Sequence, residues 1–252
     1  MNGSGSSSDS INLLDIIFTA VLTVGLTPEI IGFKGMLSEG WVMGAMAGKS
    51  VDLTSQEIVH LIAFATGVST LLLSWFGIHA SLQARPIKYG STWGMFRFIL
   101  DVALIFSYGL VLLFFRQLTA VVFLLMLIYG TFVIWDIFKI AEYRDEYFDP
   151  RRIQHLRLSV RAPVSSARSL IAYFPRQFVS LWFAICFSVL WIVSSIGVPL
   201  AQVSIALLAL LFTALYRIGK SHPKICVRAT LVINALLLGY AAAHASIPST
   251  GH

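Results

Sequence analysis

Long apolar runs dominate the chain and alternate with short polar or charged stretches. The runs reach the ~20 residues that a helix needs to cross a bilayer. None shows the alternation of a membrane β-strand. Arg116-Gln117 separates the third run from the fourth, and Gly197-Val198-Pro199 separates the fifth from the sixth, so both connections are tight turns. The pattern predicts an all-α integral membrane protein with about seven transmembrane helices, over 12–33, 58–82, 95–115, 118–141, 178–197, 199–217 and 224–245.

Composition agrees with lipid as the solvent. Of the 252 residues, 57% are hydrophobic and 12% are charged, whereas a soluble domain carries about 25% charged residues. Because lipid offers no hydrogen bonds, each backbone amide must find a partner within the chain, which leaves helices or closed barrels. The long runs favour helices, and we expect an integral protein of the plasma (inner) membrane.

The positions of Lys and Arg predict the orientation. If the segments after the second, fourth and sixth runs are cytoplasmic, only Lys34, Lys49 and Arg116 lie outside. These inner segments are 83–94, 142–177 and 218–223. The positive-inside rule then places the N-terminus in the cytoplasm and the C-terminus outside. The net charge of +6 follows from this topology, so no nucleic-acid partner is predicted.

The chain divides into regions by composition. The linker begins with the mixed-sign stretch Glu142-Tyr143-Arg144-Asp145-Glu146 and then becomes basic. It either lies solvated against anionic headgroups or docks a cytoplasmic protein partner or an anionic ligand. The predicted regions are a disordered tail 1–11, a four-helix region 12–141, a basic cytoplasmic linker 142–177, a three-helix region 178–245 and a tail 246–252.

Ionisable residues within the spans form a predicted inner polar layer. Such residues are costly in a membrane and are functional candidates for that reason. Arg97 and Asp101 are four residues apart and share a helix face, and we expect Asp101 to partner Arg97 or His79. The layer is either a clamp that fixes helix register or a gate or proton-linked site at the inner mouth of a pathway. Its members are Asp15, His79, Arg97, Asp101, Asp136 and Lys139.

The first predicted helix carries a polar stripe. Asp15, Thr19, Thr23 and Thr27 recur every four residues, a spacing that drifts only ~40° per step on an α-helix. Glu29 follows at the outer end. The stripe either lines a water-filled path or packs against a neighbouring helix, because small polar residues favour close approach.

Motifs of catalysis and metal binding are absent from the sequence. It contains no HExxH, GxSxG or nucleotide-binding loop. The six histidines are scattered, and Cys186 and Cys226 lie in apolar context as two expected buried small hydrophobes. We therefore predict no enzyme activity, no cofactor and no metal site.

Asp15-Ile16-Ile17-Phe18-Thr19-Ala20 stands at the start of the first helix, and Trp75 and His79 lie four residues apart in the second. On these residues the first four helices resemble the lysosomal potassium channel family and its bacterial tetrameric relatives. In that family a Phe-Ser-Asp motif opens the pore-lining first helix, and the second helix ends in Trp-x-x-His-His. The resemblance aligns Asp15 with the start of that pore helix, and it aligns Trp75 and His79 with the second motif. Leu13-Leu14 stands where Phe-Ser belongs, and only one His remains. The resemblance implies a potassium-conducting oligomer with apolar constrictions, and it adds Trp75 to the inner polar layer.

Two functions follow as predictions. The first is a homo-oligomeric ion channel, with an inorganic ion as its substrate and the inner polar layer holding or gating the path. Its pore-lining candidates are Thr19, Thr23, Thr27 and Glu29. The alternative is a membrane sensor or scaffold that signals to a cytoplasmic partner through the basic linker.

Overall fold

The computed structural model describes residues 12–24, 27, 55–143, 179–195 and 202–245, and these form helices with no strand. Five helices are long and apolar enough to cross a membrane. They are α3 (Ser55–Ala84), α4 (Thr92–Leu113), α5 (Leu118–Glu142), α10 (Gln202–Ser221) and α11 (Pro223–Ala245). Two shorter apolar helices are Asn12–Val24, called the first helix below, and α9 (Val179–Ser195). The prediction of an all-helical protein is confirmed for the described residues, and five of their helices could span a membrane.

The described helices lie where the apolar runs predict, with ends shifted by a few residues, and residues 25–26 and 28–33 of the first predicted span lie outside the described residues. α5 continues through Glu142, which the sequence assigned to the linker, and α10 continues past Arg217 to Ser221. α11 begins at Pro223, since proline suits the first turn of a helix, where no backbone donor is required. α4 follows Ser91, whose extended backbone (φ −103°, ψ 135°) ends the preceding loop.

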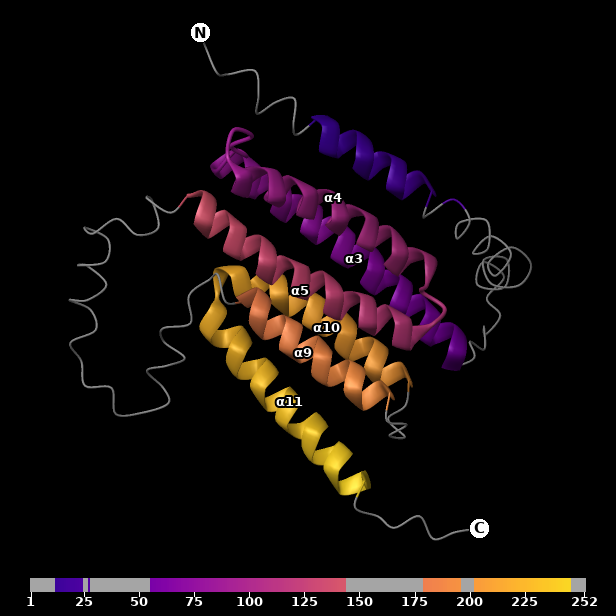
Figure 1. Ribbon diagram of the computed structural model, residues 1–252. Coiled ribbons are helices and arrows are strands. Elements are labelled where there is room, and N and C mark those ends of the chain that lie inside the picture. The colour runs from indigo at the N-terminus through magenta and orange to yellow at the C-terminus, as the bar shows by residue number, and fades with distance from the viewer. Residues whose placement is uncertain (1–11, 25–26, 28–54, 144–178, 196–201, 246–252) are drawn as a thin grey trace, which may run out of the picture.

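Helices that follow one another along the chain, from α3 to α11, run antiparallel, whereas α10 runs parallel to its neighbour α3 (Figure 1). α4 and α5 are joined by a tight turn in which the Gln117 amide donates to the Phe114 carbonyl at 2.8 Å, as the Arg116-Gln117 break predicts. α9 packs along α5, α10 packs along α3, and α11 lies outside against α9 and α10. One end of the bundle therefore collects the last turns of α3, α5 and α10 with the first turns of α4 and α11. We call it the polar end.

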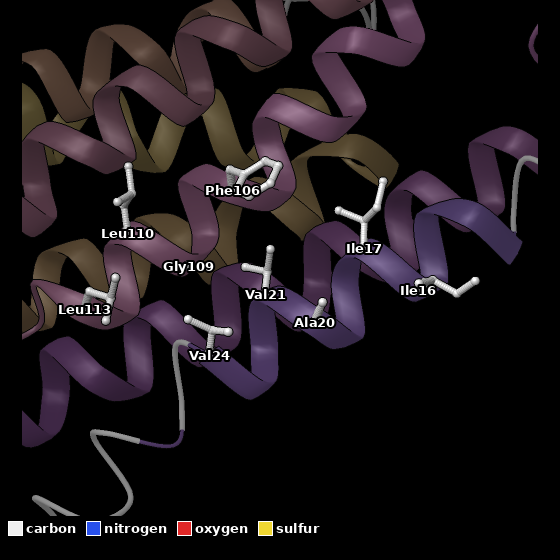
Figure 2. A pocket seen from close by; sticks show the side chains of 9 residues that line it. All are labelled: Ile16, Ile17, Ala20, Val21, Val24, Phe106, Gly109, Leu110 and Leu113. Atoms are coloured by element: carbon white, nitrogen blue, oxygen red, sulfur yellow. The ribbon is translucent and has the colours of Figure 1, made fainter.

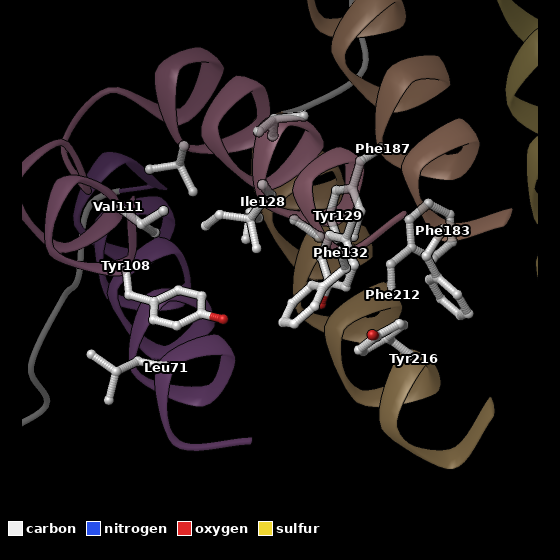
Figure 3. Close-up of a cluster of buried hydrophobic side chains, with 14 of the residues drawn as sticks. Leu71, Tyr108, Val111, Ile128, Tyr129, Phe132, Phe183, Phe187, Phe212 and Tyr216 are labelled. Carbon is white, nitrogen blue, oxygen red and sulfur yellow. The ribbon is translucent and has the colours of Figure 1, made fainter. Parts of the chain in front are cut away.

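An aromatic cluster joins the two halves of the chain (Figure 3). Tyr129 of α5 stacks on Phe187 of α9, with ring centroids 4.7 Å apart and planes 7° from parallel. Tyr216 of α10 meets Tyr129 edge to face at 4.7 Å, and Phe183 and Phe212 complete the cluster. These rings are buried, so α9 and α10 share one core with the first part of the chain.

Large apolar side chains also cover the outside of the bundle. On α11, Leu236 is 70% exposed and Ile225 is 67% exposed. Phe76 on α3 and Phe106 on α4 are exposed as well. Such a surface suits contact with lipid, in agreement with the composition.

Candidate functional site

The first helix is attached to the bundle along one face, the anchoring face, formed by Leu14, Phe18 and Val21. Leu14 and Phe18 are buried. Val21 lies over Gly109 of α4, where an added Cβ would come within 2.7 Å of Val21 Cγ1. Gly109 therefore allows the close approach of the two backbones, as small residues do at membrane helix interfaces.

Replacing Gly109 with leucine should push the first helix away from α4. We expect faster amide hydrogen exchange over 12–24 in the purified protein, measured by mass spectrometry. The matched control is Gly130→Leu, because an added Cβ at Gly130 meets no atom within 4 Å. Unchanged exchange in the Gly109 variant would contradict this attachment.

Beside that contact, an apolar groove of about 380 Å³ runs between the first helix and α4 (Figure 2). Ile17 and Val21 form one wall, and Phe106 and Leu110 form the other. Because the side chains of the first helix and α4 leave this groove open, contacts with α4 alone do not fully determine the position of the first helix. Contacts with α3 supply the rest.

A small polar and aromatic cluster links the first helix to α3. Phe18 stacks on Trp75, with ring centroids 3.9 Å apart and planes 16° from parallel. The Trp75 ring in turn lies 4.1 Å from the His79 ring. His79 Nε2 is 3.1 Å from Asp15 Oδ1. The structure thus brings together Asp15, Trp75 and His79, which the sequence singled out on two separate helices.

The opposite face of the first helix, the threonine face, points away from the bundle. Thr19, Thr23 and Thr27 are exposed, with Ile16 and Ala20 beside them, and this face borders a shallow open hollow. The Thr19 hydroxyl donates to the Asp15 carbonyl, and the Thr23 hydroxyl donates to the Thr19 carbonyl, both at 2.8 Å. The Thr27 hydroxyl likewise donates to the Thr23 carbonyl. Each hydroxyl is therefore bonded within its own helix while its oxygen remains accessible.

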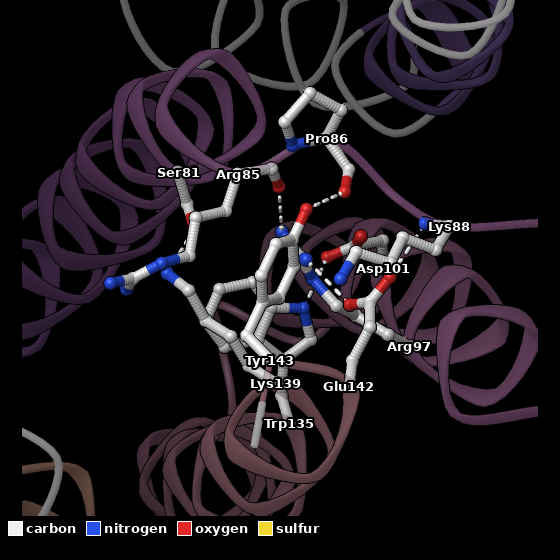
Figure 4. Close-up of polar contacts among 10 residues, drawn as sticks. All are labelled: Ser81, Arg85, Pro86, Lys88, Arg97, Asp101, Trp135, Lys139, Glu142 and Tyr143. Carbon is white, nitrogen blue, oxygen red and sulfur yellow. Dashed lines mark hydrogen bonds and ion pairs between the residues drawn. The ribbon is translucent and has the colours of Figure 1, made fainter. Parts of the chain in front are cut away.

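At the polar end, a fully buried ion pair joins α4 to α5 (Figure 4). Arg97 Nη1 donates to Glu142 Oε2 at 2.9 Å, and both side chains are 0% exposed. Arg97 also donates to the Arg85 carbonyl at 3.1 Å. The Lys88 amide donates to Glu142 Oε1 at 2.6 Å. The pair thereby also fixes the loop that follows α3.

Asp101 has a different partner from the expected one. Its Oδ1 accepts a hydrogen bond from Trp135 Nε1 at 2.8 Å. Arg97 instead pairs with Glu142 and lies 4.9 Å from the centre of the Trp135 ring, and His79 pairs with Asp15. The expected partnership of Asp101 with Arg97 or His79 is therefore wrong. Two residues on one face of a helix can each find a partner on a neighbouring helix, and here Glu142 and Trp135 of α5 supply the partners of Arg97 and Asp101.

Two further contacts tie α5 to the end of α3. The Lys139 ammonium donates to the Ser81 hydroxyl and lies 4.8 Å from the centre of the Trp135 ring. The Tyr143 hydroxyl donates to the Pro86 carbonyl. Together with the buried ion pair, they cross-link α3, α4 and α5 at the polar end (Figure 4).

A second polar cluster connects α5 to the C-terminal helices. Asp136 Oδ2 lies 3.2 Å from Lys220 Nζ and accepts a hydrogen bond from Ser180 at 2.7 Å. Ser180 is also 3.2 Å from the Tyr216 hydroxyl. The predicted inner layer is therefore organised as three groups, centred on Asp15, Arg97 and Asp136.

Sequence reasoning missed Glu142, Ser180 and Lys220. A signal for Glu142 was present: Trp135, Lys139 and Glu142 follow a helical spacing of four and three, which places all of them on one face. No sequence signal pairs Lys220 or Ser180 with Asp136, since they meet only through helix packing.

Several sequence predictions lie outside the described residues. They concern Glu29, the tails 1–11 and 246–252, and the linker from 144 onward. Cys186 and Cys226 are described, and both are buried and free, as expected. Within the described residues, no group of three or more His, Cys, Asp or Glu is arranged to hold a metal ion. Comparison of the chain with protein-family models, curated proteins and solved structures gives no match.

Proposed function

We propose that the protein is an ion-conducting homo-oligomer of the plasma (inner) membrane, with the threonine face of the first helix lining the path. Seven spans, a cytoplasmic N-terminus and an external C-terminus belong to the same proposal. One observation carries it: the helix is fixed to the bundle by its anchoring face, while Thr19, Thr23 and Thr27 on the threonine face are exposed and bond within their own helix.

Polarity supports this orientation of the threonine face. The Asp15 side chain is 44% exposed, and a charged group facing lipid is unfavourable. Copies arranged around an axis would turn Asp15, Thr19 and Thr23 toward a shared water-filled path. Ile16 and Ala20 on the same face supply apolar constrictions, which can gate by dewetting.

The polar end suits the role of a rigid frame around such a path. Its buried ion pair and hydrogen bonds hold α3, α4 and α5 together, and α3 carries His79, the partner of Asp15. A change in the Asp15–His79 contact would alter how the first helix is seated. In the proposal this contact is the gating element, and the two other groups are structural.

Cysteine accessibility tests the proposed path. In a background with Cys186 and Cys226 replaced by alanine, Thr19→Cys and Thr23→Cys should react with a small water-soluble thiol reagent in intact vesicles. Leu14→Cys and Phe18→Cys are the matched controls on the anchoring face and should remain unmodified. The reagent should also lower potassium flux from liposomes for the two threonine variants. Unreactive cysteines on both faces would overturn the assignment of the path.

Protease protection tests the topology. A tag at Asn2 should be digested only after the membrane is opened to the cytoplasmic face, and a tag after His252 should be digested by external protease. The reason is the gathering of basic residues on one side. In agreement, the described helices place Arg85, Lys88 and Lys220 at the polar end and Arg116 at the opposite turn. Protection of both tags would contradict seven spans in favour of six.

The alternative function, a sensor or scaffold acting through the basic linker, stays a prediction. Residues 144–177 lie outside the described part of the chain. Stable capture of a soluble protein together with an inactive liposome assay would favour it over conduction.

A further inference from the structure

A cavity of about 380 Å³ lies between α3, α5 and α10 at the polar end. None of the described residues of the first helix lines it, so it is distinct from the proposed path. Its polar lining includes Ser81 of α3, Asp136 and Lys139 of α5, and Arg217 and Lys220 of α10. Positive charge is therefore in excess around the cavity.

The charges are compensated unequally. Lys220 is paired with Asp136 at 3.2 Å. Lys139 is bonded to the neutral hydroxyl of Ser81. No carboxylate among the described residues forms an ion pair with Lys139 or Arg217. Two cations thus line one cavity with no carboxylate of the described part of the chain within ion-pair distance of either.

Gly77 makes room for one of these cations. A Cβ added at Gly77 would lie 2.9 Å from Arg217 Nη1. The Arg217 guanidinium of α10 therefore lies against α3 at Gly77, where a larger residue would leave it less room. The rim beside it is formed by small exposed residues, Ala80 and Ala84. The guanidinium is therefore next to an opening in the bundle.

We propose that this cavity binds a phosphate-bearing anion, with Arg217 and Lys139 as its ligands. The planar fork of a guanidinium matches two phosphate oxygens, and an ammonium adds a compact charge. Basic pockets between spanning helices bind anionic lipid headgroups on the cytoplasmic side. The apolar walls formed by Leu73 and Ile78 suit the first part of an acyl chain. A headgroup and a free phosphate present the same oxygens, so the experiment must separate these sources.

Binding to the intact protein in detergent tests the site. Native mass spectrometry with phosphatidylglycerol or phosphatidylcholine reports lipid binding, and tryptophan fluorescence during titration with inorganic phosphate reports the soluble anion, since Trp135 lines the cavity. We expect saturable binding of phosphatidylglycerol that Arg217→Gln weakens about ten-fold or more. Arg228→Gln, an exposed arginine of α11, should leave it unchanged. If only inorganic phosphate binds in an Arg217-dependent way, the ligand is a soluble phosphate.

A second variant keeps every charge. Gly77→Leu should fill the space beside Arg217 and weaken binding of the same probe, whereas Gly130→Leu should not. This variant decides the outcome if Arg217→Gln does not fold. Affinity equal to the wild type for both probes in either folded variant, or binding of neither probe by the wild type, overturns the proposal.

Discussion

Replacing Glu142 with alanine is expected to destabilise the protein by ~3–5 kcal/mol, because it leaves the buried guanidinium of Arg97 without its counter-charge. Both side chains are fully buried, and they lie 2.9 Å apart. The same substitution removes the acceptor of the Lys88 amide, so the loop between α3 and α4 loses a fixed point as well. Thermal unfolding in detergent should show a large fall in melting temperature.

Two further variants distinguish the effect of leaving Arg97 buried without a counter-charge from the effect of losing a charged side chain at this end of the bundle. Lys224→Ala removes an exposed charge at the same end of the bundle and should change the melting temperature little. Arg97→Met combined with Glu142→Leu removes both charges and should recover much of the loss, since apolar replacements of a buried pair are often neutral or stabilising. A Glu142→Ala protein as stable as the Lys224→Ala control would show that the ion pair does not support the fold.

The helices were predictable because their signal is local. A run of about 20 apolar residues is enough to predict a membrane helix, and this signal does not depend on which other helices the segment packs against. The ends were less certain: α5 extends to Glu142, where charged residues suggested a linker. A charge at a helix end is compatible with burial when a partner is present, and no local pattern reveals the partner.

Pairings within the candidate site were predictable only in part. Trp75 and His79 are four residues apart on α3, so their shared face followed from sequence, and the structure brings Asp15 to that face. The sequence does not reveal the partner of Asp136. It is Lys220, on a helix far along the chain, and the contact depends on how α10 packs along α3 and how α9 packs along α5. Rotation of each helix about its axis decides such contacts.

Substituting tryptophan for Thr23 should abolish most potassium flux while leaving the protein assembled. The prediction rests on the proposed function. Thr23 is exposed on the threonine face, opposite the anchoring face, so an indole there would project into the shared path of the oligomer without disturbing Phe18 or Trp75. Liposome flux and size-exclusion chromatography measure the two properties.

The matched control for this substitution is Leu236→Trp. Leu236 is 70% exposed on α11, so it accepts the same indole on a surface suited to lipid, and flux should be retained. Conduction at the wild-type rate by an intact Thr23→Trp oligomer would show that the threonine face does not line the path. Since the threonine hydroxyls are already bonded to backbone carbonyls of their own helix, that face could then serve packing between protomers. Dissociation of the Thr23→Trp oligomer, with Leu236→Trp intact, would indicate that role.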